Sequence, residues 1–194
     1  MIIGFVGPAG AGKDAACDAL VEELGYEKRS FAEPMREAMR RLNPILGVPS
    51  EWMREWPAEV RWNDLPYHEA KFSFGGEGRR LLQVLGTEIG REMFGENFWV
   101  EQAIRGISSG DPVCFSDVRF KSEAEAITLM GGHLIRIIRP DVLDLGAHSE
   151  HASETEARYI LTTARVVNHD SLEAFQARCV SQVRDLVAAD QAVF

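Results

Sequence analysis

The sequence predicts a three-layer α/β domain built on a mostly parallel sheet. Short apolar runs that fit buried strands alternate along the chain with segments whose apolar residues recur at helical spacing. The first apolar run leads directly into a glycine-rich loop, after which helix-forming residues begin. Alternation of this kind favours parallel strands joined by crossover helices. A chain of 194 residues suits one such domain, and we assign residues 1–194 to it.

Each element carries its own signals. The runs that fit strands are residues 1–6, 26–31, 112–116, 133–138 and 164–168. The segments that fit helices are residues 13–24, 33–42, 79–94, 98–107, 124–130 and 171–188. Gly25 follows the first helix where a left-handed cap is expected, and Pro34 suits the first turn of the second helix. Asn43 and Pro44 end that second helix.

Residues 44–78 interrupt the alternation. Prolines and glycines break this stretch repeatedly, yet it contains three of the four tryptophans, Trp52, Trp56 and Trp62. A solvated linker would lack such aromatic residues, so we predict a compact insertion or cap in which they form a local core.

Composition narrows the class of protein. The formal net charge is −9 and the pI is about 5.1, a balance that disfavours a polyanion such as double-stranded nucleic acid as partner. The three cysteines, Cys17, Cys114 and Cys179, are widely separated in the sequence. We predict that they act as small apolar residues in a protein of a reducing compartment. The sequence shows no signal peptide and no apolar run of membrane-spanning length, so we predict a cytoplasmic protein without a membrane partner.

The strongest motif is a phosphate-binding loop at residues 7–14 (GPAGAGKD). Its glycines let successive backbone N–H groups curl round a phosphate chain, while the following helix start and Lys13 add positive charge. Asp14 stands where Ser or Thr normally ligates Mg²⁺, so we expect it to hold the ion through a water or to position the lysine. The competing interpretation is an ordinary glycine-rich turn.

Two further groups of charged residues are candidates for phosphate binding. Arg79 and Arg80 open a helix, where positive charge is unfavourable to the helix dipole, which suggests an anion to neutralise; two solvated arginines are the alternative. Asp117 and Arg119 follow a buried strand, at the sheet edge where ligands bind in α/β proteins. An internal salt-linked turn explains that pair equally well.

Read together, these motifs resemble the deoxynucleoside monophosphate kinases of bacteriophages, of the type found in T-even phages. The similarity runs over nearly the whole chain, with residues 44–78 matching poorly. The matching segments are residues 7–14, 31–38, 79–88, 99–100, 117–119 with Glu123, 130–132, 138–140, 148–150 and 167–168.

The resemblance implies a P-loop fold of the nucleoside-monophosphate-kinase type with strand order 2-3-1-4-5. It also implies transfer of the γ-phosphoryl group of ATP to a deoxynucleoside monophosphate with Mg²⁺. Residues 141–163 then occupy the position of a lid. The resemblance leaves a homodimer open as oligomeric state and, for a phage-encoded chain, implies the host cytoplasm.

The resemblance also assigns roles to residues. It implies that Lys13, Arg80 and Arg119 are catalytic and that Asp14 and Asp117 bind the metal. ATP binding falls to Ala9, Gly10, Ala11, Gly12, Lys13, Asp14, Ala15, Arg139 and Asn168. Acceptor binding falls to Arg79, Arg80, Gln83, Gly86, Thr87, Trp99, Asp117, Arg119 and Glu123. The alternatives are another P-loop small-molecule kinase and a non-catalytic ATP-binding module.

Overall fold

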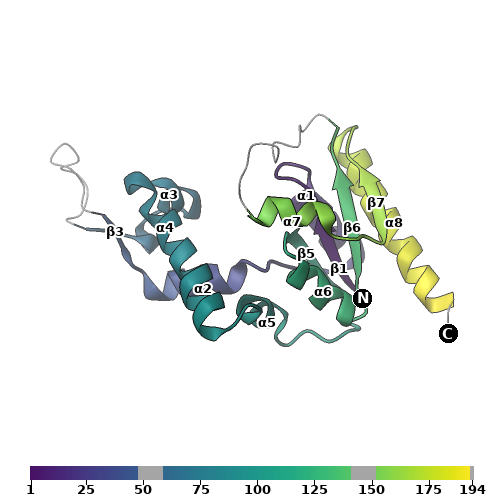
Figure 1. Cartoon of the computed structure of the whole chain (residues 1–194). Coiled ribbons are helices and arrows are strands. Elements are labelled where there is room, and N and C mark those ends of the chain that lie inside the picture. Colours follow the sequence, from purple (N-terminus) through teal and green to yellow (C-terminus); the bar gives the residue numbers. More distant parts are fainter. Residues whose placement is uncertain (48–58, 141–151, 193–194) are drawn as a thin grey trace. The chain divides into compact units, whose positions relative to one another are not determined.

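The computed structural model describes residues 1–47, 59–140 and 152–192 and divides into two compact units (Figure 1). The first unit contains Met1–Phe31 and Ile104–Phe194, and the second contains Ala32–Ala103. Each unit is described by itself below. Residues 48–58 of the predicted insertion, with Trp52 and Trp56, and residues 141–151 of the predicted lid lie outside the described residues.

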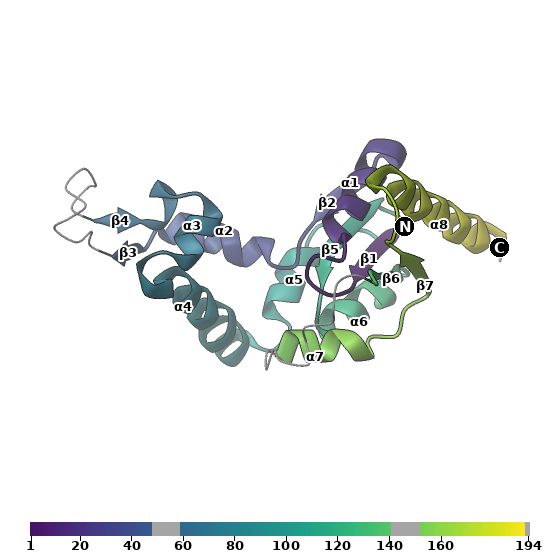
Figure 2. The same cartoon turned by 90° about the horizontal axis from the view of Figure 1, so that it is seen from above.

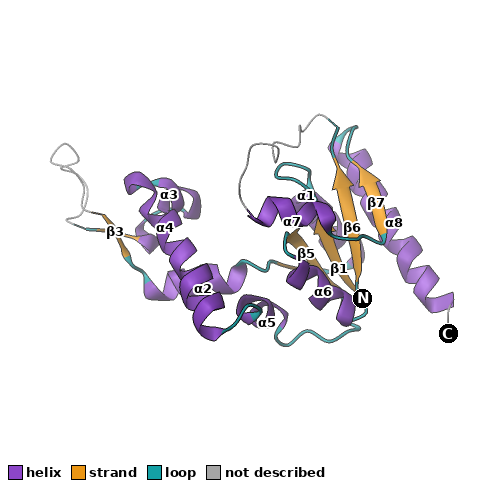
Figure 3. Cartoon of the chain, in the orientation of Figure 1, coloured by secondary structure: helices purple, strands orange, loops and turns teal. Residues whose placement is uncertain are grey.

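A five-stranded parallel sheet forms the centre of the first unit (Figure 3). Its order is β2-β5-β1-β6-β7, which confirms the strand order 2-3-1-4-5 that the resemblance implied. The central strand β1 pairs with β5 on one side, with Ile3 opposite Cys114, and with β6 on the other, with Ile3 opposite His133. The strands are β1 (Ile2–Val6), β2 (Glu27–Arg29), β5 (Val113–Val118), β6 (His133–Ile138) and β7 (Ala164–Val167).

Helices cover both faces of this sheet, which gives the three layers expected from the sequence (Figure 2). On one face α1 (Lys13–Leu24) packs beside α8 (Leu172–Ala192). On the other face lie α6 (Lys121–Leu129) and α7 (Ala152–Tyr159). Because both faces are covered, every residue of β1 is buried, as expected for a central parallel strand.

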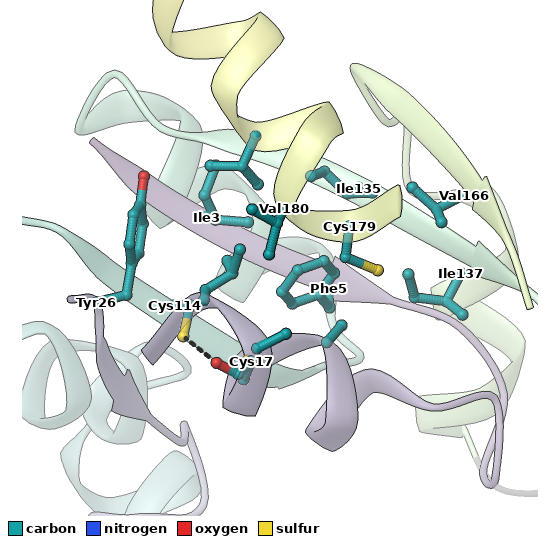
Figure 4. Close-up of a cluster of buried hydrophobic side chains, with 14 of the residues drawn as sticks. Ile3, Phe5, Cys17, Tyr26, Cys114, Ile135, Ile137, Val166, Cys179 and Val180 are labelled. Carbon is teal, nitrogen blue, oxygen red and sulfur yellow. Dashed lines mark hydrogen bonds between the residues drawn. The ribbon is translucent and has the colours of Figure 1, made fainter. Parts of the chain in front are cut away.

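The main core lies between the sheet and the pair α1 and α8 (Figure 4). Phe5, Ile135 and Ile137 from the strands are fully buried there with Phe175 from α8, each contributing about 1.5–3 kcal/mol through removal from water. All three cysteines are free and buried, which confirms their prediction as apolar residues. Burial raises the pKa of the Cys179 thiol to about 12, so this thiol stays protonated at neutral pH.

The second unit is mostly helical and has a core of its own. Buried residues of that core include Met39, Trp62 and Leu82, so Trp62 of the predicted insertion packs in a core that it shares with residues outside 44–78. The elements are α2 (Glu33–Leu42), β3 (Ile45–Gly47), β4 (Val60–Arg61), η1 (Trp62–Asp64), α3 (Tyr67–Phe72), η2 (Phe74–Gly76), α4 (Glu77–Gln83), η3 (Val84–Met93) and α5 (Phe98–Ile104).

Two features of this unit differ from the elements read from the sequence. The strands β3 and β4 pair as a short antiparallel ladder, which was not predicted from the sequence. The segment 79–94 is not one regular helix, because α4 passes at Val84 into a π-helix, η3. Among the described residues, no helix combines the length and the apolar character needed to cross a lipid bilayer.

Candidate active site

The loop between β1 and α1 has the backbone conformation that wrapping a phosphate chain requires. Gly10 and Gly12 have φ angles of +74° and +108°, in the left-handed region that favours glycine. Ala11 N donates to Pro8 O at 3.2 Å and closes the turn. The helix α1 begins at Lys13, so the amide groups of its first turn, which lack helical partners, end the loop.

Lys13 is held against the start of this loop. Its side chain is buried, with 8% of the residue exposed, and its ammonium donates to the carbonyls of Gly7 and Pro8 at 2.8 Å each. A buried ammonium needs such partners, and here they keep the positive charge at the loop. Lys13 is therefore positioned to meet an anion bound by the loop amides.

Two predicted ATP-binding residues reach the loop from other strands of the sheet. Arg139, which follows β6, donates from its guanidinium to Gly10 O at 3.0 Å. Asn168, which follows β7, donates from Nδ2 to Ala11 O at 2.9 Å. Both residues thus support the loop backbone from the side, and their contact with ATP stays a prediction.

Asp14 belongs to a cluster of charged residues at the beginning of α1. Its Oδ1 accepts a hydrogen bond from the buried Ser116 hydroxyl at 2.9 Å and lies 3.0 Å from the Lys28 ammonium. Lys28 also pairs with Asp18 at 2.8 Å. Burial alone would raise the pKa of Asp14, but hydrogen bonds from Lys28 and Ser116 and the charges of Lys28 and Lys13 outweigh it. The net pKa of Asp14 is therefore lowered, and the carboxylate is ionised at neutral pH.

Neither Lys28 nor Ser116 was among the residues predicted from the sequence. Ser116 directly precedes Asp117 at the carboxyl end of β5, so its place at the sheet edge was a usable signal. Lys28 gave no signal, because its contact with Asp14 depends on β2 lying beside β5.

Asp117, predicted to bind metal or substrate, joins β5 to the segment that follows β2. Its Oδ2 accepts from the Ser30 hydroxyl at 2.6 Å, and its Oδ1 accepts from Phe31 N at 2.9 Å. The ring of Phe31 stacks on Phe115 at 4.3 Å between centroids beside this link. Asp117 thus has a clear structural role, while its contact with a metal or a substrate stays a prediction.

Glu123 fixes the turn that carries Arg119. Its carboxylate is buried, and Oε2 accepts from the backbone N–H groups of Arg119 at 2.7 Å and Phe120 at 3.0 Å, at the start of α6. The Arg119 side chain is exposed, and within residues 1–47, 59–140 and 152–192 no hydrogen bond or ion pair of its guanidinium is present. A charged group on a rigid turn can meet a phosphate with little loss of conformational entropy.

The other predicted acceptor residues lie on α4, η3 and α5 of the second unit. Arg80 is exposed and makes a bidentate pair with Glu77, with Nε to Oε2 at 2.8 Å and NH2 to Oε1 at 2.7 Å. Gln83 and Thr87 are exposed, and their contact with a substrate stays a prediction. Trp99 is partly buried, and its indole N–H donates to Gly86 O at 3.0 Å. Arg79 is exposed.

The residues around the loop suit a magnesium ion. Asp14 offers an ionised carboxylate, and Mg²⁺ prefers hard oxygen ligands, usually one or two carboxylates completed by waters and substrate phosphates. In the described part of the chain, no three His, Cys, Asp or Glu side chains gather as a metal cage. The donor set therefore fits an ion that arrives with a nucleotide better than one held by protein alone.

Comparisons with known proteins agree with this geometry. The family model described as deoxynucleotide monophosphate kinase matches residues 70–179. A putative deoxynucleotide monophosphate kinase of Acanthamoeba polyphaga mimivirus is 31% identical over 206 residues, which cover 94% of this chain and 96% of that protein. The deoxynucleoside-5'-monophosphate kinase of Escherichia phage T5 is 32% identical, with 87% of this chain and 89% of that protein covered.

Among solved structures, shikimate kinase from Aquifex aeolicus is similar in fold. The TM-score is 0.52 at 12% sequence identity, with 97% of this chain and 99% of that chain covered. At this identity the likeness concerns the fold alone. It agrees with the parallel sheet and the loop after its central strand.

Proposed function

Because the chain belongs to the deoxynucleotide monophosphate kinase family, we propose that it transfers the γ-phosphoryl group of ATP to a deoxynucleoside 5'-monophosphate. The products are ADP and a deoxynucleoside diphosphate. The observation that carries this proposal is the loop of residues 7–14, in which Gly10 and Gly12 adopt left-handed φ angles and Lys13 is held at the loop.

ATP binds through this loop. Backbone N–H groups of residues 9–14 surround the β and γ phosphates, and the Lys13 ammonium stabilises the charge on their oxygens. Ala9, Ala11 and Ala15 contribute through their backbone, and Arg139 and Asn168 keep the loop in shape through Gly10 O and Ala11 O. Phosphoryl transfer depends on positioning and on charge neutralisation, which is what these groups supply.

Asp14 is the residue that holds Mg²⁺ when the nucleotide binds, directly or through a water, with Asp117 as a second candidate. A magnesium ion held there would supply neutralisation of the negative charge on the transferred phosphoryl group. Ser116 and Lys28 both contact Oδ1 of Asp14 and lower the pKa of its carboxyl group. The positive charge of the Lys28 ammonium also neutralises part of the negative charge of Asp14.

The acceptor monophosphate needs cationic groups with planar geometry. Arg119 supplies one of them from a turn that Glu123 fixes. A guanidinium pairs with two phosphate oxygens at once, which a lysine ammonium does not do.

In the second unit, Arg80, with Arg79 beside it, is the cationic group proposed for phosphate binding. Gln83, Gly86, Thr87 and Trp99 contact the nucleoside part of the acceptor. Arg80 already holds a carboxylate, that of Glu77, in the bidentate geometry that a phosphate would use.

A coupled assay tests the proposed function. Folded protein is incubated with ATP, Mg²⁺ and each deoxynucleoside monophosphate in turn, and ADP release is followed. Release that depends on one or more of these acceptors is expected. If none supports ADP release above the rate with ATP alone, the proposal fails.

A further inference from the structure

The helix η3 (Val84–Met93) is a π-helix of ten residues, an uncommon conformation that the sequence pattern does not favour. Leu82, Leu85, Ile89 and Met93 recur at the spacing of a single apolar stripe on an α-helix. In the structure, Leu85 and Gly90 are the buried residues of η3 and are five positions apart. Ile89 and Met93 are 37% and 71% exposed.

Exposure of two large apolar side chains costs free energy that burial on an α-helical stripe would recover. Some other contact must therefore hold the segment in the π conformation. The contact that the structure offers is with Trp99, the second residue of α5.

Trp99 acts on η3 in two ways. Its indole N–H donates to Gly86 O at 3.0 Å, and this is the carbonyl that would accept from the N–H of residue 90 in an α-helix. The indole edge also occupies the space beside Gly90. A Cβ at position 90 would overlap Nε1 and lie 2.6 Å from Cε2 and 2.9 Å from Cδ1 of the ring.

We propose that Gly90 is a positioning residue that, packed against the indole of Trp99, holds η3 in its π-helical form and so sets the direction of Thr87 relative to Gln83. A π turn holds more residues than an α turn, so it changes the angle round the helix axis between residues four apart, such as Gln83 and Thr87. Both side chains are exposed, and both belong to the acceptor contacts under Proposed function, on which this inference rests. Gly90 touches no substrate in this scheme and acts through the helix alone.

The test compares four variants of the full chain with the wild type. Gly90→Ala adds the clashing Cβ but keeps the indole. Trp99→Leu removes both the hydrogen bond and the ring atoms that the added Cβ would meet, and the double variant combines the two. Glu92→Ala is the matched control, since it also places alanine in η3 but at an exposed position.

The KM for the deoxynucleoside monophosphate and for ATP and the Tm are measured on every variant. Hydrogen exchange of the Trp99 indole N–H is measured by NMR on the wild type, Gly90→Ala and Glu92→Ala, with the signal assigned through its loss in Trp99→Leu. In the wild type this N–H exchanges slowly because it is hydrogen-bonded. Gly90→Ala and Trp99→Leu each raise the acceptor KM at least fivefold and change the ATP KM less than twofold, while Glu92→Ala changes neither.

The double variant separates positioning from stability. Gly90→Ala lowers the Tm strongly when Trp99 is present but little in the Trp99→Leu background, because the clash is gone. The acceptor KM of the double variant nevertheless stays high, because η3 is no longer held. An acceptor KM that recovers with the Tm, or that stays within twofold of the wild type in Gly90→Ala, overturns the proposal. Fast exchange of the wild-type indole N–H overturns it as well.

Failure of the proposed function would look different. A wild type without turnover rejects that function, while indole exchange and the Tm of the four variants still test whether Trp99 and Gly90 hold η3. If Gly90→Ala does not fold, Trp99→Leu and the double variant carry the kinetic comparison.

Discussion

The ammonium of Lys28 lies 3.0 Å from Oδ1 of Asp14 and binds that carboxylate together with the Ser116 hydroxyl. The pair joins the first turn of α1 to β2, so a residue outside the loop controls the charge at its end. Burial opposes ionisation of Asp14, but these hydrogen bonds and the charge of Lys28 favour the carboxylate, so the pKa of Asp14 is lowered.

The first prediction concerns pH and stability. Because the folded-state pKa of Asp14 lies below its unfolded value of 3.8, its contribution to stability is present above that value and is lost as pH falls through the folded pKa. In Lys28→Gln the pKa of Asp14 moves upward. The difference in free energy of unfolding between wild type and variant should therefore shrink as pH falls below 3.8, as measured by urea titration.

Lys121→Gln is the control, because it removes a lysine charge at an exposed position of α6. Its difference from the wild type should change little over the same pH range. If Lys28→Gln and Lys121→Gln behave alike, the Asp14 to Lys28 pair does not set the pKa of Asp14.

The second prediction concerns Lys13. Lys13→Met keeps the length and the buried apolar stem but removes the ammonium that Gly7 O and Pro8 O hold. Loss of one preorganised charge at a transferred group costs about 100-fold to 1,000-fold in kcat. ADP release should fall by at least that factor while circular dichroism stays unchanged; a variant that keeps a tenth of the wild-type kcat would contradict the role.

The third prediction concerns the pair of Arg80 and Glu77. Arg80→Ala should raise the KM for the deoxynucleoside monophosphate about tenfold or more and leave the ATP KM unchanged, because a bidentate phosphate contact is lost. Glu77→Gln should act in the opposite direction, since the amide competes less for the guanidinium. Exposed ion pairs are weak, so the expected decrease in acceptor KM is about two- to fivefold.

Steady-state kinetics with the acceptor varied at saturating ATP measures both changes. The double variant Arg80→Ala/Glu77→Gln serves as control and should match Arg80→Ala alone. A Glu77→Gln effect that persists without Arg80 would show that Glu77 acts by another route.

Local signals in the sequence were sufficient for the five strands and the loop. The buried strands β1 and β5 have apolar sequences, whereas β2 is charged and mostly exposed and was predicted from its position after the cap at Gly25. The glycines of GPAGAGK predict the backbone conformation of the loop. The strand order came from the family resemblance, because pairing of β1 with β5 depends on residues more than a hundred positions apart.

The features that escaped prediction all depend on tertiary contacts. Leu85 and Ile89 have α-helical spacing, but both lie in the π-helix η3, whose Gly86 carbonyl accepts a hydrogen bond from Trp99 of α5. Lys28 meets Asp14 only once β2 has joined the sheet. Propensity and periodicity describe neighbours along the chain and carry no information on such contacts.

The last prediction compares two glycines of the loop that differ in their surroundings. The Cβ that Gly10→Ala adds has no other atom within 4 Å. The cost is therefore that of the left-handed backbone alone, about 1–2 kcal/mol in the free energy of unfolding. Gly12→Ala adds a Cβ that would lie 2.7 Å from Asn168 Nδ2 and 3.0 Å from Phe175 Cε1, so either the loop or its Asn168 support must move. We therefore expect Gly12→Ala to lose more stability in urea titration and to raise the ATP KM more than Gly10→Ala does. Equal losses for the two variants would mean that Asn168 and Phe175 do not confine the loop.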